Sequence, residues 1–219
     1  MGDAFAVKDC ALIAIATGEL AQTLRELRDK LKTISTSCIY YHFWGGLLRP
    51  RFDDPEYQND FAVWCSRSLH DKALAERLAL IDPTHYPDLE DLRRELVETI
   101  EERLEESEVL AWMTASGRFY FVRSQIVVFD TGKRITTLEE LTSRVPHMSQ
   151  GTVFYHLIDA RRRTPQGNND FSEWLMGFGE EYRELSDRIT CIDPYFTTLT
   201  DLRDDLSKVL LSYTRERRG

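Results

Sequence analysis

The chain has 219 residues, of which 42% are hydrophobic, 30% charged and 11% aromatic. This is the composition of a globular protein, and it excludes intrinsic disorder, a collagen-like chain and a disulfide-rich scaffold. The length allows one or two domains. No apolar run approaches the roughly 18 residues of a membrane span, so we expect no membrane segment.

The net charge of −9 argues against nucleic acid as a partner. Nonspecific binding to nucleic acid requires Lys and Arg side chains that displace counterions. The charge is also uneven, because residues 1–110 hold 13 basic and 22 acidic side chains and residues 111–219 hold 15 of each. This asymmetry fits an ordinary solvated surface, or a face that favours basic partners.

The four cysteines, Cys10, Cys38, Cys65 and Cys191, contain no Cys-x-x-Cys pair. Neither a redox motif nor a zinc knuckle is therefore indicated. The first residues lack the basic stretch and the long apolar stretch of a secretory signal. We expect a cytoplasmic protein with reduced, mostly buried thiols.

An internal repeat organises the sequence. The chain matches itself when it is shifted by 114 residues, and a four-residue deletion later changes the shift to 110. The matched pairs include Phe5 and Phe119, Thr17 and Thr131, His42 and His156, Arg49 and Arg163, and Asn59-Asp60 and Asn169-Asp170. A match of this extent predicts two tandem copies of one unit, residues 1–109 and 118–219, joined by a helical segment.

Each copy is expected to open with extended chain. Residues 119–129 are aromatic and β-branched, which favours a strand over a helix. Asp9-Cys10 and Arg123-Ser124 are predicted to form a turn inside this segment. Thr17-Gly18 and Thr131-Gly132 are predicted to end it, because glycine tolerates positive φ.

A helix is expected next in each copy. Thr23 and Glu26 have the spacing of a capping box, as do Thr137 and Glu140. The following helix is capped by Ser35 or Ser37 in the first copy and by Ser149 in the second. It carries His42 or His156 within a run that is apolar on all sides, so we expect it to be deeply buried.

The later helices follow from capping and proline signals. Asp60 and Asp170 are predicted to cap the helices that carry Trp64 and Trp174. Further helices stop before Asp82-Pro83 and Asp193-Pro194, and the last ones begin at Asp88 and Thr198.

The predicted fold class is mainly α with a small β element (α+β). Short strands are not stable alone, so they require helices over them or pairing across the two copies. A pseudo-twofold arrangement around one joint core is favoured, and two loosely tied domains are the alternative.

Several motifs carry a resemblance to a known family. The runs FAVKDCALIAIATG, IYYHFWGGLLRPRF and NDFAVW, followed by IDP and a Leu-rich helix, resemble an uncharacterised bacterial family, a domain of unknown function whose members repeat this pattern twice. The likeness covers nearly the whole chain. The second copy departs from it, because Leu157-Ile158 replaces Phe43-Trp44. The resemblance supplies no catalytic residues.

The polar residues present in both copies are the candidate site residues. They are His42, Arg49, Asn59 and Asp60 in the first copy, and His156, Arg163, Asn169 and Asp170 in the second. The histidine and the arginine are two helical turns apart and share a face if the helix runs that far, although Gly45-Gly46 weakens this in the first copy. One interpretation is a pocket for an anion or a sugar phosphate. The other is a buried histidine that is hydrogen-bonded to an aspartate or a carbonyl.

The Asn-Asp pairs also have two interpretations. They orient the histidine as in a catalytic triad, or they cap helices. No serine or cysteine nucleophile is present in both copies, so no catalytic residue is assigned. The five histidines show no metal-binding spacing and no Gly-rich phosphate loop is present, so we expect neither a metal nor a cofactor.

Two functions remain open. The first is a non-enzymatic protein-interaction or scaffold module that binds a protein partner or forms a homodimer, since most repeated polar residues have a structural role. The second is a binding protein or enzyme that acts on a sugar phosphate or similar anion through the His/Arg/Asn-Asp set.

Overall fold

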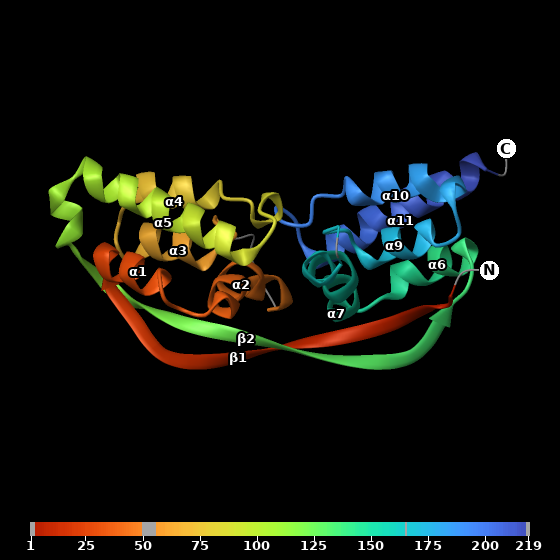
Figure 1. The fold of residues 1–219 in the computed structure, drawn as a ribbon, viewed down its shortest axis with the longest axis horizontal. Coiled ribbons are helices and arrows are strands. Elements are labelled where there is room, and N and C mark those ends of the chain that lie inside the picture. The colour runs from red at the N-terminus through yellow and green to blue at the C-terminus, as the bar shows by residue number, and fades with distance from the viewer. Residues whose placement is uncertain (1–2, 50–55, 165, 218–219) are drawn as a thin grey trace. The chain divides into compact units, whose positions relative to one another are not determined.

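The computed structural model describes residues 3–49, 56–164 and 166–217 (Figure 1). This part of the chain is mostly helical and contains one two-stranded antiparallel sheet. The predicted α+β class is therefore confirmed. The sheet pairs β1 (Phe5–Thr23) with β2 (Thr114–Ile135).

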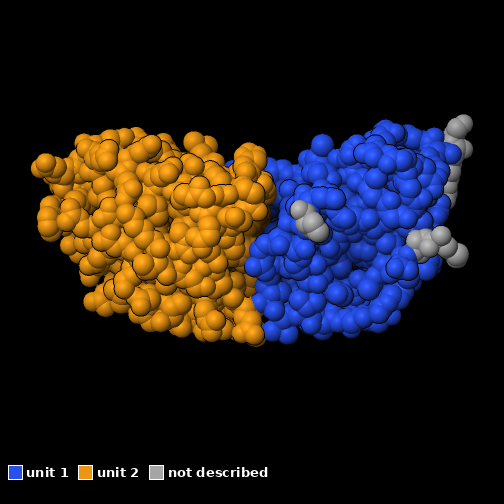
Figure 2. Space-filling model, viewed as in Figure 1, with its two compact units in different colours: residues 1–11, 126–219 blue, residues 12–125 orange. Residues whose placement is uncertain are grey.

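The chain divides into two compact units, which Figure 2 shows in different colours. Unit 1 comprises residues 1–11 and 126–219, and unit 2 comprises residues 12–125. Each strand passes from one unit into the other along its length, because β1 changes unit after Ala11 and β2 after Gln125. Each unit thus contains a piece of both strands, with helices on one side of them (Figure 1).

Helices fill the rest of each unit. Those of unit 2 are α1 (Leu24–Leu31), α2 (Thr36–Trp44), α3 (Asp60–Arg67), α4 (Lys72–Ala79) and α5 (Leu89–Glu106), with short 3₁₀ turns at Gly45–Leu48, Pro83–His85 and Glu108–Ala111. Those of unit 1 are α6 (Leu138–Arg144), α7 (Gln150–Val153), α8 (Ala160–Arg163), α9 (Asp170–Met176), α10 (Arg183–Thr190) and α11 (Leu199–Glu216), with 3₁₀ turns at Val145–His147 and Glu180–Tyr182 and a π-helical turn at Phe154–Asp159.

The predicted turn inside each opening segment is wrong, because both strands run through it. Polar side chains at these positions bond to helices instead. The Cys10 thiol donates to the Gly151 carbonyl in unit 1 (3.3 Å), and the Ser124 hydroxyl donates to the Ser37 carbonyl in unit 2 (3.2 Å).

The predicted strand ends at the two Thr-Gly pairs are also wrong. Gly18 and Gly132 have φ values of 81° and 75°, but the strands continue to Thr23 and Ile135. Glycine in this conformation is typical of a β-bulge, which bends a strand without ending it. The φ > 0 prediction was therefore right about the backbone and wrong about its consequence.

The opening strand of each expected copy, 1–109 and 118–219, packs on the helices of the other copy. In unit 1, the Phe5 ring of β1 stacks on Phe171 of α9, with 5.1 Å between centroids. In unit 2, the Phe119 ring of β2 stacks on Phe61 of α3 at 5.2 Å. Each set of helices therefore packs against the opening strand of the other stretch of sequence.

Leucine stripes form the core of each unit. Leu24, Leu27 and Leu31 of α1 lie on one face of the helix and are fully buried in unit 2. In unit 1, Leu202, Leu206 and Leu210 form a fully buried stripe on α11. Burial of each such side chain contributes roughly 1.5–3 kcal/mol to folding.

Most predicted helix starts are confirmed. Thr23 and Glu26 form a complete capping box, and Ser35, Ser149, Asp88 and Thr198 cap their helices. In α6, the Thr137 hydroxyl accepts from the Glu140 N–H, while the Glu140 carboxylate accepts from the Thr136 N–H.

The predicted caps Asp60 and Asp170 are wrong by one residue. Asn59 and Asn169 are the N-caps of α3 and α9, and their side-chain oxygens accept from backbone N–H groups three residues later, each at 2.9 Å. Both asparagines are completely buried. The adjacent aspartates are therefore available for another contact.

Candidate functional site

A buried histidine joins a helix to a strand in unit 2. His42 of α2 is only 4% exposed. Its Nδ1 lies 2.8 Å from an Asp60 carboxylate oxygen, and its Nε2 accepts the backbone N–H of Val122 in β2 at 3.1 Å. A backbone N–H can only donate, so Nε2 is the acceptor and carries no proton. Nδ1 therefore carries the ring proton and donates a hydrogen bond to Asp60.

The same arrangement occurs in unit 1. His156 is 2% exposed, its Nδ1 lies 2.7 Å from an Asp170 carboxylate oxygen, and its Nε2 accepts the backbone N–H of Lys8 in β1 at 3.0 Å. The ring is again fixed as the Nδ1–H tautomer. Both histidines thus connect their strand, their helix and an aspartate.

Aromatic rings surround each imidazole. The His42 centroid lies 4.7 Å from Phe119 and 5.3 Å from Phe61. The His156 centroid lies 4.7 Å from Phe5 and 5.5 Å from Phe171. A general base or a metal ligand needs a ring nitrogen that is free to meet its substrate or ion, and both nitrogens are occupied in each ring. This geometry favours the interpretation of buried, hydrogen-bonded histidines.

The two arginines of the candidate set differ between the units. Arg163 donates to Asp170 at 2.9 Å and to Asp159 at 3.0 Å, and its guanidinium lies 3.9 Å from the Tyr155 ring centroid. The described helical segments α7 to α8 are continuous through a π-helical turn, which brings Arg163 back to the aspartate that holds His156.

Arg49 does not repeat this contact in unit 2. Helix α2 ends at Trp44 and a 3₁₀ turn follows at the two glycines, so Arg49 leaves the helical face of His42. Its guanidinium lies 4.9 Å from the Tyr41 ring centroid, and it forms no ion pair with Asp60. The Asp60 side chain is accordingly more exposed (40%) than that of Asp170 (19%).

The electrostatics of the unit 1 centre favour a charged Asp170. Burial raises the pKa of this carboxyl group, but hydrogen bonds from His156 and Arg163 outweigh burial, so its pKa lies below the ordinary value. The pKa of Arg163 is raised, because its bonds to Asp170 and Asp159 outweigh the effect of its burial. This network is an internal ion-pair cluster.

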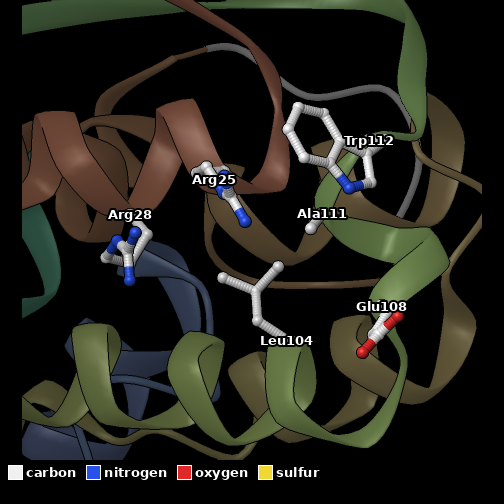
Figure 3. A pocket seen from close by; sticks show the side chains of 6 residues that line it. All are labelled: Arg25, Arg28, Leu104, Glu108, Ala111 and Trp112. Carbon is white, nitrogen blue, oxygen red and sulfur yellow. The ribbon is translucent and has the colours of Figure 1, made fainter.

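Two surface cavities lie away from these centres. In unit 2, a cavity of about 290 Å³ is lined by Arg25, Arg28, Leu104, Glu108, Ala111 and Trp112 (Figure 3). The Arg25 guanidinium lies 4.7 Å from the Trp112 ring centroid. Arg28 is held by Asp29 and Glu101.

In unit 1, a cavity of about 260 Å³ is lined by Val7, Asp9, Thr131, Lys133, Ser143, Arg144, His147, Met148, Ser149 and Thr152. None of the eight sequence candidates lines either of the two cavities. Sequence reasoning missed both, because it considered only polar residues that occur in both copies. Two features of the sequence could have indicated them. Trp112 follows the polar end of the helical segment that joins the copies, and the matched positions Glu19 and Lys133 carry opposite charges.

Among the described residues, no group of three His, Cys, Asp or Glu side chains is placed to hold a metal ion. Within the same ranges, every helix is too short or too polar to span a bilayer.

Comparison with known proteins identifies a family and a fold. A model of a family of unknown function, DUF5752, matches residues 2–211. A solved structure, OrfY from Thermoproteus tenax, is 28% identical and superposes with a TM-score of 0.82 over 96% of this chain and 95% of that chain. None of the curated proteins matches significantly.

Proposed function

This chain belongs to the DUF5752 family, whose function is unknown, and we propose that it is a non-enzymatic protein-interaction module. The observation that carries the proposal is the exposed Trp112 indole beside an arginine-lined cavity in unit 2. This surface combines the residue types that dominate the energetics of protein interfaces.

The repeated polar residues support the proposal by their engagement in the fold. His42 and His156 use both ring nitrogens, and Asn59 and Asn169 cap helices. The alternative of an anion site on the His/Arg/Asn-Asp set therefore has no unoccupied histidine nitrogen to offer a ligand. The anion site on these residues stays a prediction.

The Trp112 surface has the physical character of a docking point. Trp112 is 74% exposed and Val109 is 72% exposed, and the two lie three residues apart around a 3₁₀ turn, where such residues share a face. Arg25 stacks on the indole, while Leu104 lines the cavity (Figure 3). An indole, an arginine and a small cavity can accept one anchoring side chain of a partner.

We also infer that residues 1–109 and 118–219 are two copies of one duplicated sequence. Equivalent hydrogen bonds in the two units support this inference. Trp64 donates its indole N–H to the Gly117 carbonyl at 2.7 Å, and Trp174 donates to the Asp3 carbonyl at 2.8 Å. The Thr17 hydroxyl donates to a β2 carbonyl in unit 2, just as Thr131 donates to a β1 carbonyl in unit 1.

A cytoplasmic location is part of the proposal. Cys10, Cys38 and Cys65 are free and buried. Burial, with a smaller effect of Asp159 and Asp9, raises the pKa of Cys10 to about 12, and burial also raises the pKa of Cys65. Such thiols are unreactive and fit a reducing compartment.

The experiment compares the wild type with Trp112→Ala and with Phe196→Ala, a control that removes another exposed aromatic ring, in unit 1. Light scattering after size exclusion measures the oligomeric state, and quantitative affinity capture measures retained proteins. We expect a dimer, or one retained protein, that Trp112→Ala loses and Phe196→Ala keeps. A wild type that stays monomeric and retains no protein through Trp112 would refute the proposal.

A further inference from the structure

The unit 1 cavity gathers basic side chains around a small space. Lys133, Arg144 and His147 line it above the buried side chains of Val7 and Met148. We propose that this cavity binds a small oxyanion, either free phosphate or the phosphoryl group of a small phosphomonoester. The site is independent of the Trp112 surface.

The basic side chains of the cavity are not held by a direct ion pair, although the Asp9 carboxylate lies in the same lining. In the part of the chain that the structure describes, Lys133, Arg144 and His147 form no ion pair. On α6, Glu140 accepts from the Thr136 N–H and hydroxyl, and it interacts with the charge of Arg144 without forming an ion pair with it. Two permanent positive charges that line one cavity repel each other, and a bound anion removes this repulsion.

Unit 2 contains the same framework with the charges balanced. Glu19 and Lys133 occupy equivalent places, because the backbone N–H of each donates to the threonine hydroxyl two residues earlier, at 3.1 and 3.3 Å. Lys30 and Arg144 are likewise equivalent, since each lies in the last turn of the helix that follows the strand.

In unit 2, Glu19 forms an ion pair with Lys30. In unit 1, a second cation, Lys133, replaces the carboxylate, and the partner position of Arg144 is left to a ligand. The difference between the two units therefore indicates that an anion from outside takes the place of the Glu19 carboxylate.

The remaining polar side chains of the lining determine which groups of a ligand can be bound. The hydroxyls of Thr131 and Ser143 donate to carbonyl groups, so recognition depends on the charged donors. The Asp9 carboxylate accepts from the Ser149 hydroxyl (2.8 Å) and from the Cys10 N–H (2.8 Å). As the one acid in the lining, it reduces the positive charge and can accept a ligand hydroxyl.

Size limits the ligand further. The volume of about 260 Å³ is below the range of roughly 300–1,000 Å³ that holds drug-sized molecules. Arginine and lysine are the side chains that bind phosphate oxygens most strongly, Arg with paired donors and Lys as a point charge. A phosphoryl group with a short hydroxylated remainder therefore matches the cavity in charge, donors and volume.

The test measures binding of inorganic phosphate and of glycerol phosphate by titration calorimetry, in chloride buffer of matched ionic strength. The variants are Lys133→Glu, which recreates the unit 2 ion pair, and Arg144→Gln. Lys30→Gln in unit 2 is the matched control. We expect saturable binding to the wild type and to the control, and at least about tenfold weaker binding to the two unit 1 variants.

Thermal unfolding without ligand checks that Lys133→Glu is folded, which we expect because it supplies a counterion to Arg144. Stronger binding of glycerol phosphate identifies a phosphomonoester as the ligand, and equal binding identifies free phosphate. The proposal is overturned if neither compound binds saturably, or if Lys30→Gln weakens binding as much as the unit 1 variants do.

Discussion

Replacing His42 by alanine removes the ring that joins α2 to β2 in unit 2. The change breaks the bond from Nδ1 to Asp60 (2.8 Å) and leaves the Val122 N–H, held at 3.1 Å, without its acceptor. A hydrogen bond to a charged group contributes about 1.5–3 kcal/mol, and an unsatisfied buried donor costs about 1–3 kcal/mol. We therefore expect the free energy of unfolding to fall by about 2.5–6 kcal/mol.

Two further variants separate the two bonds. His42→Gln places an amide oxygen within reach of Val122, and His42→Asn places an amide near Asp60, so each is expected to restore part of the loss. Urea unfolding followed by circular dichroism measures the free energies, with His85→Ala as a control because that side chain is 79% exposed. A loss below about 0.5 kcal/mol for His42→Ala, the range of ordinary surface changes, would show that the ring does not hold strand and helix together.

Three more predictions concern acid stability, backbone packing and thiol reactivity. The pKa of Asp170 is lowered in the folded state, so the charged carboxylate stabilises the fold above the ordinary aspartate pKa, and this stabilisation is lost on acidification. Between about pH 5 and pH 2, urea unfolding should show a steeper fall in the free energy of unfolding for the wild type than for Asp170→Asn. Gly151→Ala should destabilise the protein by at least about 1–3 kcal/mol, because its new Cβ would overlap an Asp9 carboxylate oxygen and the Cys10 carbonyl oxygen. A Cβ at Gly117 would meet only a serine side chain, at 3.3 Å, so equal melting temperatures for the two alanine variants would contradict this. A disulfide reagent should label one thiol rapidly in the native protein, the exposed Cys191, and rapid labelling that persists in Cys191→Ser would refute the assignment.

Local patterns predicted the element types well. The aromatic and β-branched residues of 119–129 identified the opening segment of both copies as strand, although the Ala-rich first copy alone also fits a helix. The strand lengths were wrong because glycine and polar residues commonly mark turns. Here the Cys10 and Ser124 side chains bond to helices that are distant in sequence, and the threonines of the Thr-Gly pairs bond to the opposite strand. No local pattern reveals these contacts.

The candidate centres show the same limit. Asn59 and Asp60 are both good N-cap residues, so sequence alone could not decide which one caps α3. The choice depends on His42, which forms a hydrogen bond with the Asp60 carboxylate once the helices pack together. The sequence thus placed both residues at the start of α3, while the division of roles between them required the tertiary structure.

Which helices each opening strand covers was beyond sequence reasoning. Phe5 and Phe119 are the same residue type in the same context, so each is able to stack on either Phe61 or Phe171. The anion site was missed for the opposite reason. The search required polar residues common to both copies, whereas the informative position is Lys133, where the copies differ in charge.

The passage of each strand from one unit into the other determines the order in which the protein is completed during synthesis. Unit 2 is one continuous stretch of chain, residues 12–125, and has all its parts as soon as β2 has emerged from the ribosome. Unit 1 must wait, because the bond between Trp174 and Asp3 joins residues 171 positions apart. The unit 1 part of β1 therefore lacks these neighbours until α9 has been translated, and contacts between such distant residues form slowly.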